Sequence, residues 1–343
     1  MKVFVTGGTG FVGSHIVSAL VAAGHDVRLL VRRPEQVPVS FAPHGIVPSD
    51  LVVGDVRDSR VVSRGIDGCD AVVHAAAVFS LRRRDAHTVA ETNVAATRTV
   101  LDAAVAAAAD PIVHVSSTAA LTRRDGGGSD LPLGDQDDAY GKSKVDCERV
   151  ARGLQDTGAP VVSLYPGAVL GPHDPYLGEQ ANRLAWVARG LFPIWPRGGY
   201  HSVDVRDVAA TVAGCMEPRR LGQRYVVPGT HVDGDRYFSA VAAAIGRRRP
   251  HLETPTRVAR AMAGSMRPVN AVLPERWYYP ADADGIAFTE RDTRFDDSPA
   301  RTNLGITPWV FEETVRDTLT WLVDAGHLPA RLRPESLVGP SSS

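Results

Sequence analysis

The sequence has few cysteines, no long apolar run and almost no net charge. Its 343 residues include three cysteines, Cys69, Cys147 and Cys215, which lie far apart and lack the spacing of metal ligands. Such a sparse, odd set does not build a disulfide framework and fits a reducing compartment. No stretch reaches the ~18 uninterrupted apolar residues of a membrane span, and the first apolar segment is too short for a secretory signal. We therefore expect a cytoplasmic protein with no membrane span and no metal.

The charge balance excludes a second group of functions. A formal net charge of -1 provides no global field that would attract nucleic acid or an anionic membrane. Apolar residues make up 44% of the chain and charged residues 22%, which is typical of a soluble globular protein with a large core. We expect a small-molecule substrate as the partner and no nucleic acid.

Strand-like apolar runs alternate with helical patterns through the first half of the chain. This alternation predicts an α/β fold with a doubly wound parallel (Rossmann) sheet. The predicted strands are 2–6, 26–31, 51–53, 70–74, 111–116 and 161–165, and the predicted helices are 12–23, 86–108 and 138–154.

The pattern changes after about residue 167, where glycine, proline and aromatic residues become frequent. We expect a smaller, irregular C-terminal substrate lobe that packs over the carboxyl edge of the sheet. The expected organisation is a dinucleotide-binding domain at 1–166, to which 200–230 return, a substrate lobe at 167–330 and a flexible tail at 331–343. Helices are predicted at 207–216, 237–245, 256–266 and 311–325.

Glycines crowd the turn after the first strand, in the segment TGGTGFVG. Gly7, Gly10 and Gly13 stand between a strand and an amphipathic helix that begins near Phe11 and Val12. Glycine lets backbone N–H groups approach a pyrophosphate closely, and the N-terminus of the helix adds partial positive charge. The segment therefore predicts a dinucleotide site.

The end of the second strand indicates which dinucleotide binds. Arg32 and Arg33 stand where NAD-binding proteins usually place an acidic residue for the ribose 2′-hydroxyl. A guanidinium suits a 2′-phosphate by charge and by forked hydrogen bonding. This favours NADP(H), while the nearby Glu35 keeps NAD(H) open.

A second motif, YGKSK, predicts acid–base chemistry. Tyr140 and Lys144 are four residues apart in a predicted helix and so share one face. A phenol with a pKa of ~10 is a poor catalyst at neutral pH, and a nearby ammonium lowers that pKa. Ser116, Ser117 or Thr118, at the end of a predicted strand, supplies a hydroxyl that could hold the substrate oxygen.

Together these segments resemble the extended short-chain dehydrogenases/reductases, and most of all the dihydroflavonol 4-reductase-like and 3β-hydroxysteroid dehydrogenase-like members. The likeness extends over about residues 1–327. It is specific for the superfamily and says little about the substrate. Besides TGGTGFVG and YGKSK, it rests on GDVRD at 54–58, HAAA at 74–77, TNV at 92–94, VSST at 115–118, YPGAVLGP at 165–172 and SVDVRDVA at 202–209.

The resemblance implies a role for each matching residue. Tyr140 would be the acid–base, Lys144 would bind the nicotinamide ribose, and Asn93 would fix the helix and a water near Lys144. Thr118 best matches the catalytic hydroxyl, and Ser117 is the second choice. The remaining cofactor contacts would be Asp55 and Val56 at the adenine, Ala75, Ala76, Ala77 and Ser116 along the middle, and Tyr165, Pro166, Ala168 and Val169 near the nicotinamide. Tyr165 departs from the family, which often carries Arg or Asn there.

The expected reaction is hydride transfer between the cofactor and an apolar ketone, aldehyde or secondary alcohol. His173, Trp186 and Tyr200 are candidate substrate contacts. One alternative is a nucleotide-sugar epimerase or dehydratase with tightly bound NAD. It requires basic residues around a diphosphate, and Arg183, Arg189 and Arg197 are available. A second alternative is a non-catalytic redox sensor, and a homodimer is compatible with either reading.

Overall fold

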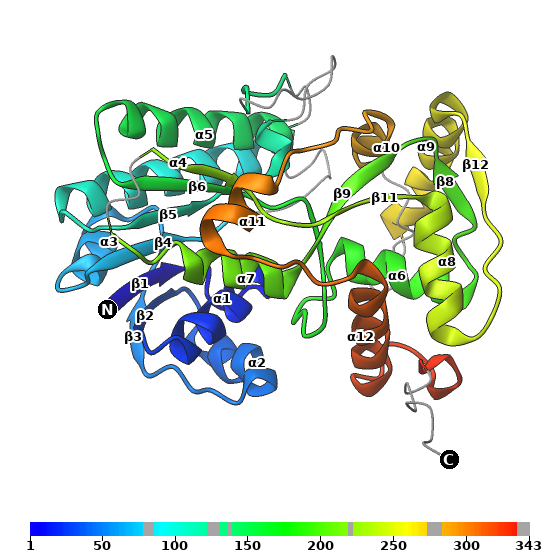
Figure 1. Ribbon diagram of the computed structural model, residues 1–343, viewed down its shortest axis with the longest axis horizontal. Helices are drawn as coiled ribbons and strands as arrows, with labels where there is room; N and C mark the ends of the chain where they lie inside the picture. Colours follow the sequence, from blue (N-terminus) through cyan, green and yellow to red (C-terminus); the bar gives the residue numbers. More distant parts are fainter. Residues whose placement is uncertain (78–85, 122–130, 136–138, 219–221, 273–282, 335–343) are drawn as a thin grey trace.

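A seven-stranded sheet forms the centre of the computed structural model, in the order β10-β6-β5-β4-β1-β2-β3, with every pairing parallel (Figure 1). The structure describes residues 1–77, 86–121, 131–135, 139–218, 222–272 and 283–334. The strands are β1 (Lys2–Thr6), β2 (Asp26–Val31), β3 (Asp50–Val53), β4 (Ala71–His74), β5 (Ile112–Val115), β6 (Val161–Tyr165) and β10 (Arg224–Val226). The predicted fold class is confirmed.

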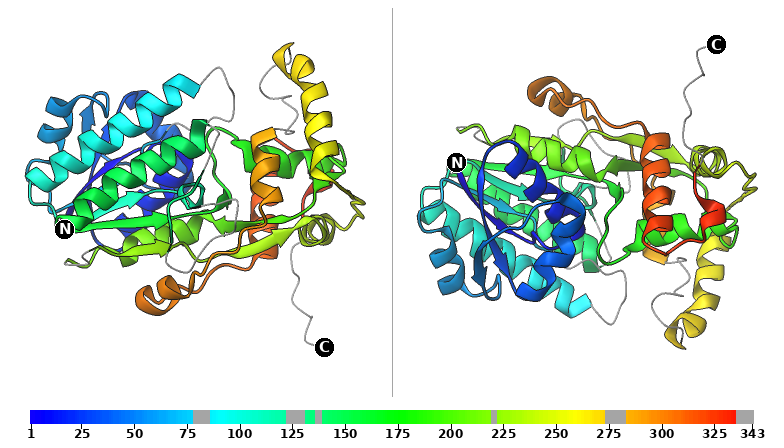
Figure 2. Two further views of the ribbon diagram at one scale, coloured as in Figure 1. Left: turned by 90° about the horizontal axis from the view of Figure 1, so that it is seen from above. Right: turned by 90° about the horizontal axis from the view of Figure 1, so that it is seen from below.

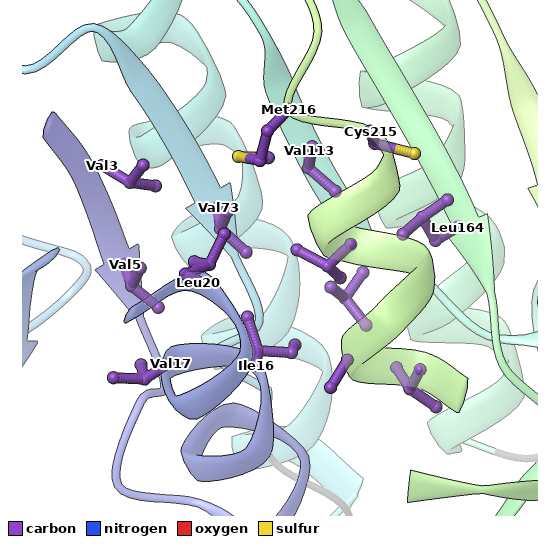
Figure 3. Packing of buried hydrophobic residues seen from close by; sticks show 14 of the residues in the cluster. Val3, Val5, Ile16, Val17, Leu20, Val73, Val113, Leu164, Cys215 and Met216 are labelled. Atoms are coloured by element: carbon purple, nitrogen blue, oxygen red, sulfur yellow. The ribbon is translucent and has the colours of Figure 1, made fainter. Parts of the chain in front are cut away.

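Helices cover both faces of this sheet. Successive residues of a strand point to opposite faces, so each strand contributes apolar side chains to both helical layers. Val3 and Val5 face one helical layer, where they pack with Ile16 and Leu20 (Figure 3), and Phe4 between them faces the other. The first layer contains α1 (Phe11–Ala22), α2 (Val37–Phe41), α7 (Val205–Gly214) and α11 (Ser298–Leu304). The second contains α3 (Ser59–Ile66), α4 (Ala86–Ala106) and α5 (Ala139–Asp156).

The C-terminal lobe has its own core and lies beside the carboxyl edge of the sheet (Figure 2). Trp195 and Tyr237 are its largest buried side chains, and their ring centroids are 5.1 Å apart. The lobe helices are α6 (Glu179–Arg189), α8 (Gly234–Ile245), α9 (Thr256–Val272), α10 (Ala283–Glu290) and α12 (Phe311–Asp324). Its strands form two small sheets: β7 (Ala168–Leu170), β9 (Gly199–Asp204) and β11 (Thr230–Asp233) in one, β8 (Ile194–Pro196) and β12 (Leu252–Thr254) in the other.

The chain crosses between the two parts several times. After β9, α7 returns to pack on α1, and β10 joins the edge of the main sheet beside β6. Of the tail expected over 331–343, residues 335–343 lie outside the described part, and Leu332 is buried in the lobe core. Among the helices that the structure describes, none has the length and apolar character needed to cross a bilayer.

Candidate cofactor and catalytic site

The glycine turn packs too closely for side chains. A Cβ added to Gly13 would lie 2.0 Å from the carbonyl oxygen of Gly7. That oxygen also accepts a 3.0 Å hydrogen bond from the N–H of Gly10, and Gly7 has a φ of +76°. On its other side, a Cβ on Gly7 would lie 2.6 Å from the backbone nitrogen of Ala76. The turn therefore brings the N-terminus of α1 against the loop that follows β4, where a pyrophosphate can meet bare backbone.

The adjacent end of β2 is basic. Arg32 and Arg33 are exposed directly after β2, and the half-buried Asp55 follows β3, the next strand of the sheet. Arg57 donates two side-chain hydrogen bonds to Asp55, at 3.0 and 2.9 Å. These bonds lower the pKa of Asp55 to about 2, and the charge of Arg32 contributes. The Asp55 carboxylate is thus already held by Arg57, with Arg32 close enough for its charge to act on it.

The ends of β4, β5 and β6 bring the other predicted cofactor residues to the same edge. Ala75 and Ala76 are half-buried, and Ala75 donates its N–H to the carbonyl of Thr6 at 3.2 Å. Thr118 donates its N–H to the carbonyl of Pro166 at 2.9 Å. Among the remaining predicted contacts, Ala77 is exposed, Val56, Ala168 and Val169 are half-buried, and Ser116 is buried.

Ser117 and Thr118, which follow β5, have different positions in a short 3₁₀ turn. Ser117 accepts the N–H of Ala119 at 3.1 Å and so caps the short 3₁₀ turn Thr118–Ala120. Thr118, the first residue of this turn, is half-buried. The capping bond orients the Ser117 hydroxyl toward its own backbone, and the turn brings Thr118 to the strand ends.

The helix α5 carries the YGKSK motif past these strand ends. Tyr140 lies in its first turn, and the Tyr140 side chain is outside the described part of the structure. Lys144 follows one turn later and is only 5% exposed. Asn93, in α4, donates to the Ser143 hydroxyl at 3.2 Å and so ties α4 to α5 next to Lys144. The helix expected to carry the acid–base pair is therefore fixed to its neighbour α4 beside Lys144.

Tyr165, the last residue of β6, takes part in a buried network with two side chains of α5. Its phenol donates to Glu148 at 2.5 Å, and Arg152 donates to the same carboxylate oxygen at 3.0 Å. Arg152 also donates to the carbonyl of Leu131 at 2.7 Å. Burial, followed by the charge of Glu148, raises the pKa of Tyr165 well above its usual value. The phenol thus points at α5 and ties β6 to that helix, a role that the expected cofactor contact did not include.

His74 joins three elements in a way that sequence reasoning did not predict. One ring nitrogen is hydrogen-bonded to the Thr6 hydroxyl at 2.8 Å, and the other to the Thr97 hydroxyl of α4 at 3.2 Å. Burial and then the charge of Lys144 lower its pKa to about 3, so the ring is neutral at physiological pH. His74 therefore fixes the end of β1, where the glycine turn starts, to the helix beside Lys144. In the part of the chain that is described, no cluster of His, Cys, Asp and Glu could hold a metal ion.

The three predicted substrate residues are in two different places. His173, with a φ of +65°, lies between His15 of α1 and Trp321 of α12, with ring centroids 6.2 and 6.3 Å away. Tyr200 stacks on Trp195 at 5.7 Å, and Trp186 packs against the same lobe core. The structure thus places His173 at the contact between α1 and the lobe, and the other two with the lobe core.

Of the three arginines proposed to surround a diphosphate, Arg183 and Arg189 are hydrogen-bonded within the lobe. Arg183 is buried and donates to Glu179 at 2.8 Å within α6. Arg189 donates to the carbonyl of His327. Arg197 is exposed on the turn between β8 and β9. The cations on α6 therefore stabilise the lobe itself.

A parallel sheet with this glycine turn and basic strand edge defines the class of Rossmann-type dinucleotide-binding proteins. A sequence model of the NAD dependent epimerase/dehydratase family matches residues 3–216. The chain belongs to this family.

Individual relatives agree with this assignment. The 4-hydroxy-2-methyl-3-oxo-4-farnesyl-3,4-dihydroquinoline-1-oxide ketoreductase of Stigmatella aurantiaca is 28% identical over 95% of this chain and 98% of its own. The 3 beta-hydroxysteroid dehydrogenase/Delta 5-->4-isomerase of Mycobacterium tuberculosis is 32% identical over 90% of this chain and 86% of its own. The crystal structure of gox2253 superposes with a TM-score of 0.78 at 26% identity, covering 95% of this chain and 99% of that chain. The resemblance to extended short-chain dehydrogenases/reductases is confirmed, and the chain is an NAD(P)-dependent enzyme of that type.

Proposed function

We propose that the protein is an NADP(H)-linked oxidoreductase that interconverts an apolar ketone or aldehyde with the corresponding alcohol. The observation that carries this proposal is the buried Lys144, one helical turn after Tyr140, on the helix α5 that Asn93 ties to α4. A buried ammonium next to a phenol favours the phenolate and makes the phenol a usable acid–base at neutral pH.

The preference for NADP(H) rests on charge at the end of β2. Arg32 and Arg33 are exposed there, and the carboxylate of Asp55, after the neighbouring strand β3, is occupied by Arg57. A 2′-phosphate would gain charge-assisted hydrogen bonds from the two arginines. A plain ribose would gain less, because Asp55 is already bonded to a guanidinium.

In the proposed mechanism each residue has one task. The bound nicotinamide supplies or accepts the hydride. Thr118 donates a hydrogen bond to the substrate oxygen, and we choose it over Ser117 because its position best matches the catalytic hydroxyl of the family. Tyr140 gives its proton to the oxygen as the alkoxide develops, and Lys144 stabilises the phenolate that remains.

The printed names of the relatives support the substrate class. One relative is named as a ketoreductase whose substrate name includes a farnesyl group, and the other as a hydroxysteroid dehydrogenase. Both names describe the oxidation of an alcohol or the reduction of a ketone on a largely apolar skeleton. The nucleotide-sugar alternative is less favoured, because Arg183 is paired with Glu179 and Arg189 is bonded to a backbone carbonyl.

A Tyr140→Phe variant tests the proposal. The variant should bind NADPH as the wild type does, and its turnover of apolar ketones should fall by roughly a hundredfold or more, as expected when a general acid is removed. Tyr225→Phe is the matched control, since that phenol is buried in β10 and bonded to Gln223, outside the strand-end site. Full turnover in Tyr140→Phe, or a purified protein that carries non-exchanging NAD, would contradict the proposal.

A further inference from the structure

A row of polar side chains crosses the sheet beneath α4 and α5. Register pairs Thr6 with His74, His74 with His114, and His114 with Ser163, on four neighbouring strands. None of the four is more than 2% exposed. Two residues earlier on each strand the matching row is apolar: Phe4, Val72, Ile112 and Val161. The face therefore changes from apolar to polar at or near the carboxyl ends of these strands.

One half of the polar row is fully bonded and the other half is not. Thr6 and His74 are hydrogen-bonded to each other, and His74 continues to Thr97. By contrast, both ring nitrogens of His114 and the hydroxyl of Ser163 have no hydrogen-bond partner among the described residues. The same holds for the hydroxyl of Ser116, which directly follows β5 and is only 3% exposed.

This unbonded half lies close to Lys144. The rings of His74 and His114 are nearly parallel, with centroids 5.6 Å apart. Burial, then His74, then the charge of Lys144 lower the pKa of His114 well below its usual value, so its ring is neutral. A neutral imidazole has one N–H donor and one acceptor nitrogen. Buried groups of this kind are almost always hydrogen-bonded, to protein or to ordered water.

We propose that His114, Ser163 and Ser116 hold internal water beneath Lys144, and that His114 is thereby a positioning residue for the Lys144 ammonium. A water that donates to the acceptor nitrogen of His114 keeps a lone pair that can accept a hydrogen bond from the Lys144 ammonium. The water thus links the Lys144 side chain to the rigid strand β5 and limits where the ammonium can lie. This inference rests on the proposed function, in which Lys144 assists the Tyr140 phenol.

The water itself is tested without any activity assay. A high-resolution crystal structure of the cofactor-free wild-type protein should show ordered water within hydrogen-bond distance of His114 and Ser163. Direct bonds between these side chains, or a dry site, would overturn the inference. This result does not depend on whether a carbonyl substrate is ever found.

The positioning role is tested by a pair of substitutions. His114→Leu should lower kcat by about tenfold and move the pH profile of kcat by about one unit, as expected for a lost hydrogen bond near a charge, while the Kd for NADPH stays within about twofold. His114→Gln, which keeps a donor and an acceptor, should restore most of kcat. Thr318→Val, at a buried hydroxyl in α12, is the control.

Equal losses of kcat in His114→Leu and His114→Gln, or an unmoved pH profile in the leucine variant, would refute the role of His114. If the leucine variant does not fold, Ser163→Ala provides the same comparison, and an unchanged pH profile there counts against the inference. A wild-type protein that turns over no carbonyl compound would instead refute the proposed function.

Discussion

Replacing Gly13 with alanine tests the close packing of the glycine turn. The added Cβ would lie 2.0 Å from the carbonyl oxygen of Gly7 and 2.7 Å from its carbon. An ordinary contact is 3.4–4 Å, so either α1 or the turn must move by more than 1 Å. Overpacking of a tight site costs about 1–3 kcal/mol, and loss of the Gly10 to Gly7 hydrogen bond adds about 1 kcal/mol. We expect Gly13→Ala to be destabilised by about 2–4 kcal/mol.

The same displacement should weaken cofactor binding. The amides at the start of α1 would no longer meet a pyrophosphate in the same geometry, and each 1.4 kcal/mol lost is about a tenfold increase in Kd. Urea denaturation measures stability, and calorimetric titration with NADPH measures affinity. Gly153→Ala is the control, because a Cβ there meets nothing within 4 Å in the helix α5, and it should leave stability unchanged or slightly raised. Wild-type stability and affinity in Gly13→Ala would refute the reasoning.

Three further predictions concern side chains of the site and its surroundings. Burial lowers the pKa of His15 from 6.5 in the unfolded chain to about 3, so its contribution is complete above pH 6.5 and decreases as pH falls. His15 alone should contribute about 2 kcal/mol to the stability lost between pH 7 and pH 5, so the loss in His15→Phe should be smaller by about that amount, and an equal loss in both proteins would contradict this. Tyr165→Phe removes the donor to Glu148 and should cost about 2 kcal/mol in thermal or urea unfolding, whereas an unchanged midpoint would exclude the network. Arg32→Ala with Arg33→Ala should raise the Kd for NADPH by about ten- to a hundredfold but leave that for NADH unaltered. Parallel losses for both cofactors would refute a 2′-phosphate site.

The sequence was sufficient to predict six of the seven strands of the sheet, β1 to β6, because each is a short apolar run close to a breaker, whereas the edge strand β10 was not predicted. Strands 2–6, 26–31 and 161–165 are confirmed at both ends. The glycine turn was predictable for the same reason, since few other arrangements require glycine at Gly7, Gly10 and Gly13 at once. The helix α6 was not predicted, because its segment follows prolines and glycines that indicate a loop.

Contacts between distant segments could not be predicted from composition. His74 and His114 are forty residues apart in the sequence, and the structure shows that β4 and β5 place them side by side. The sequence does contain a pattern that marks both histidines: His74 and His114 each stand two positions after an apolar residue of the same strand. Its meaning depends on register, which a single sequence does not specify. The direction of the Tyr165 phenol likewise depends on Glu148, seventeen residues earlier in the chain.

The central claim is that an adenine dinucleotide binds across the carboxyl edge of the sheet, with its reactive ring near Tyr140 and Lys144. Calorimetric titration of the purified wild-type protein with NADPH, and then with NADH, tests it most directly. We predict one NADPH bound per chain, with weaker binding of NADH. Absence of heat with both nucleotides at millimolar concentration would contradict the claim.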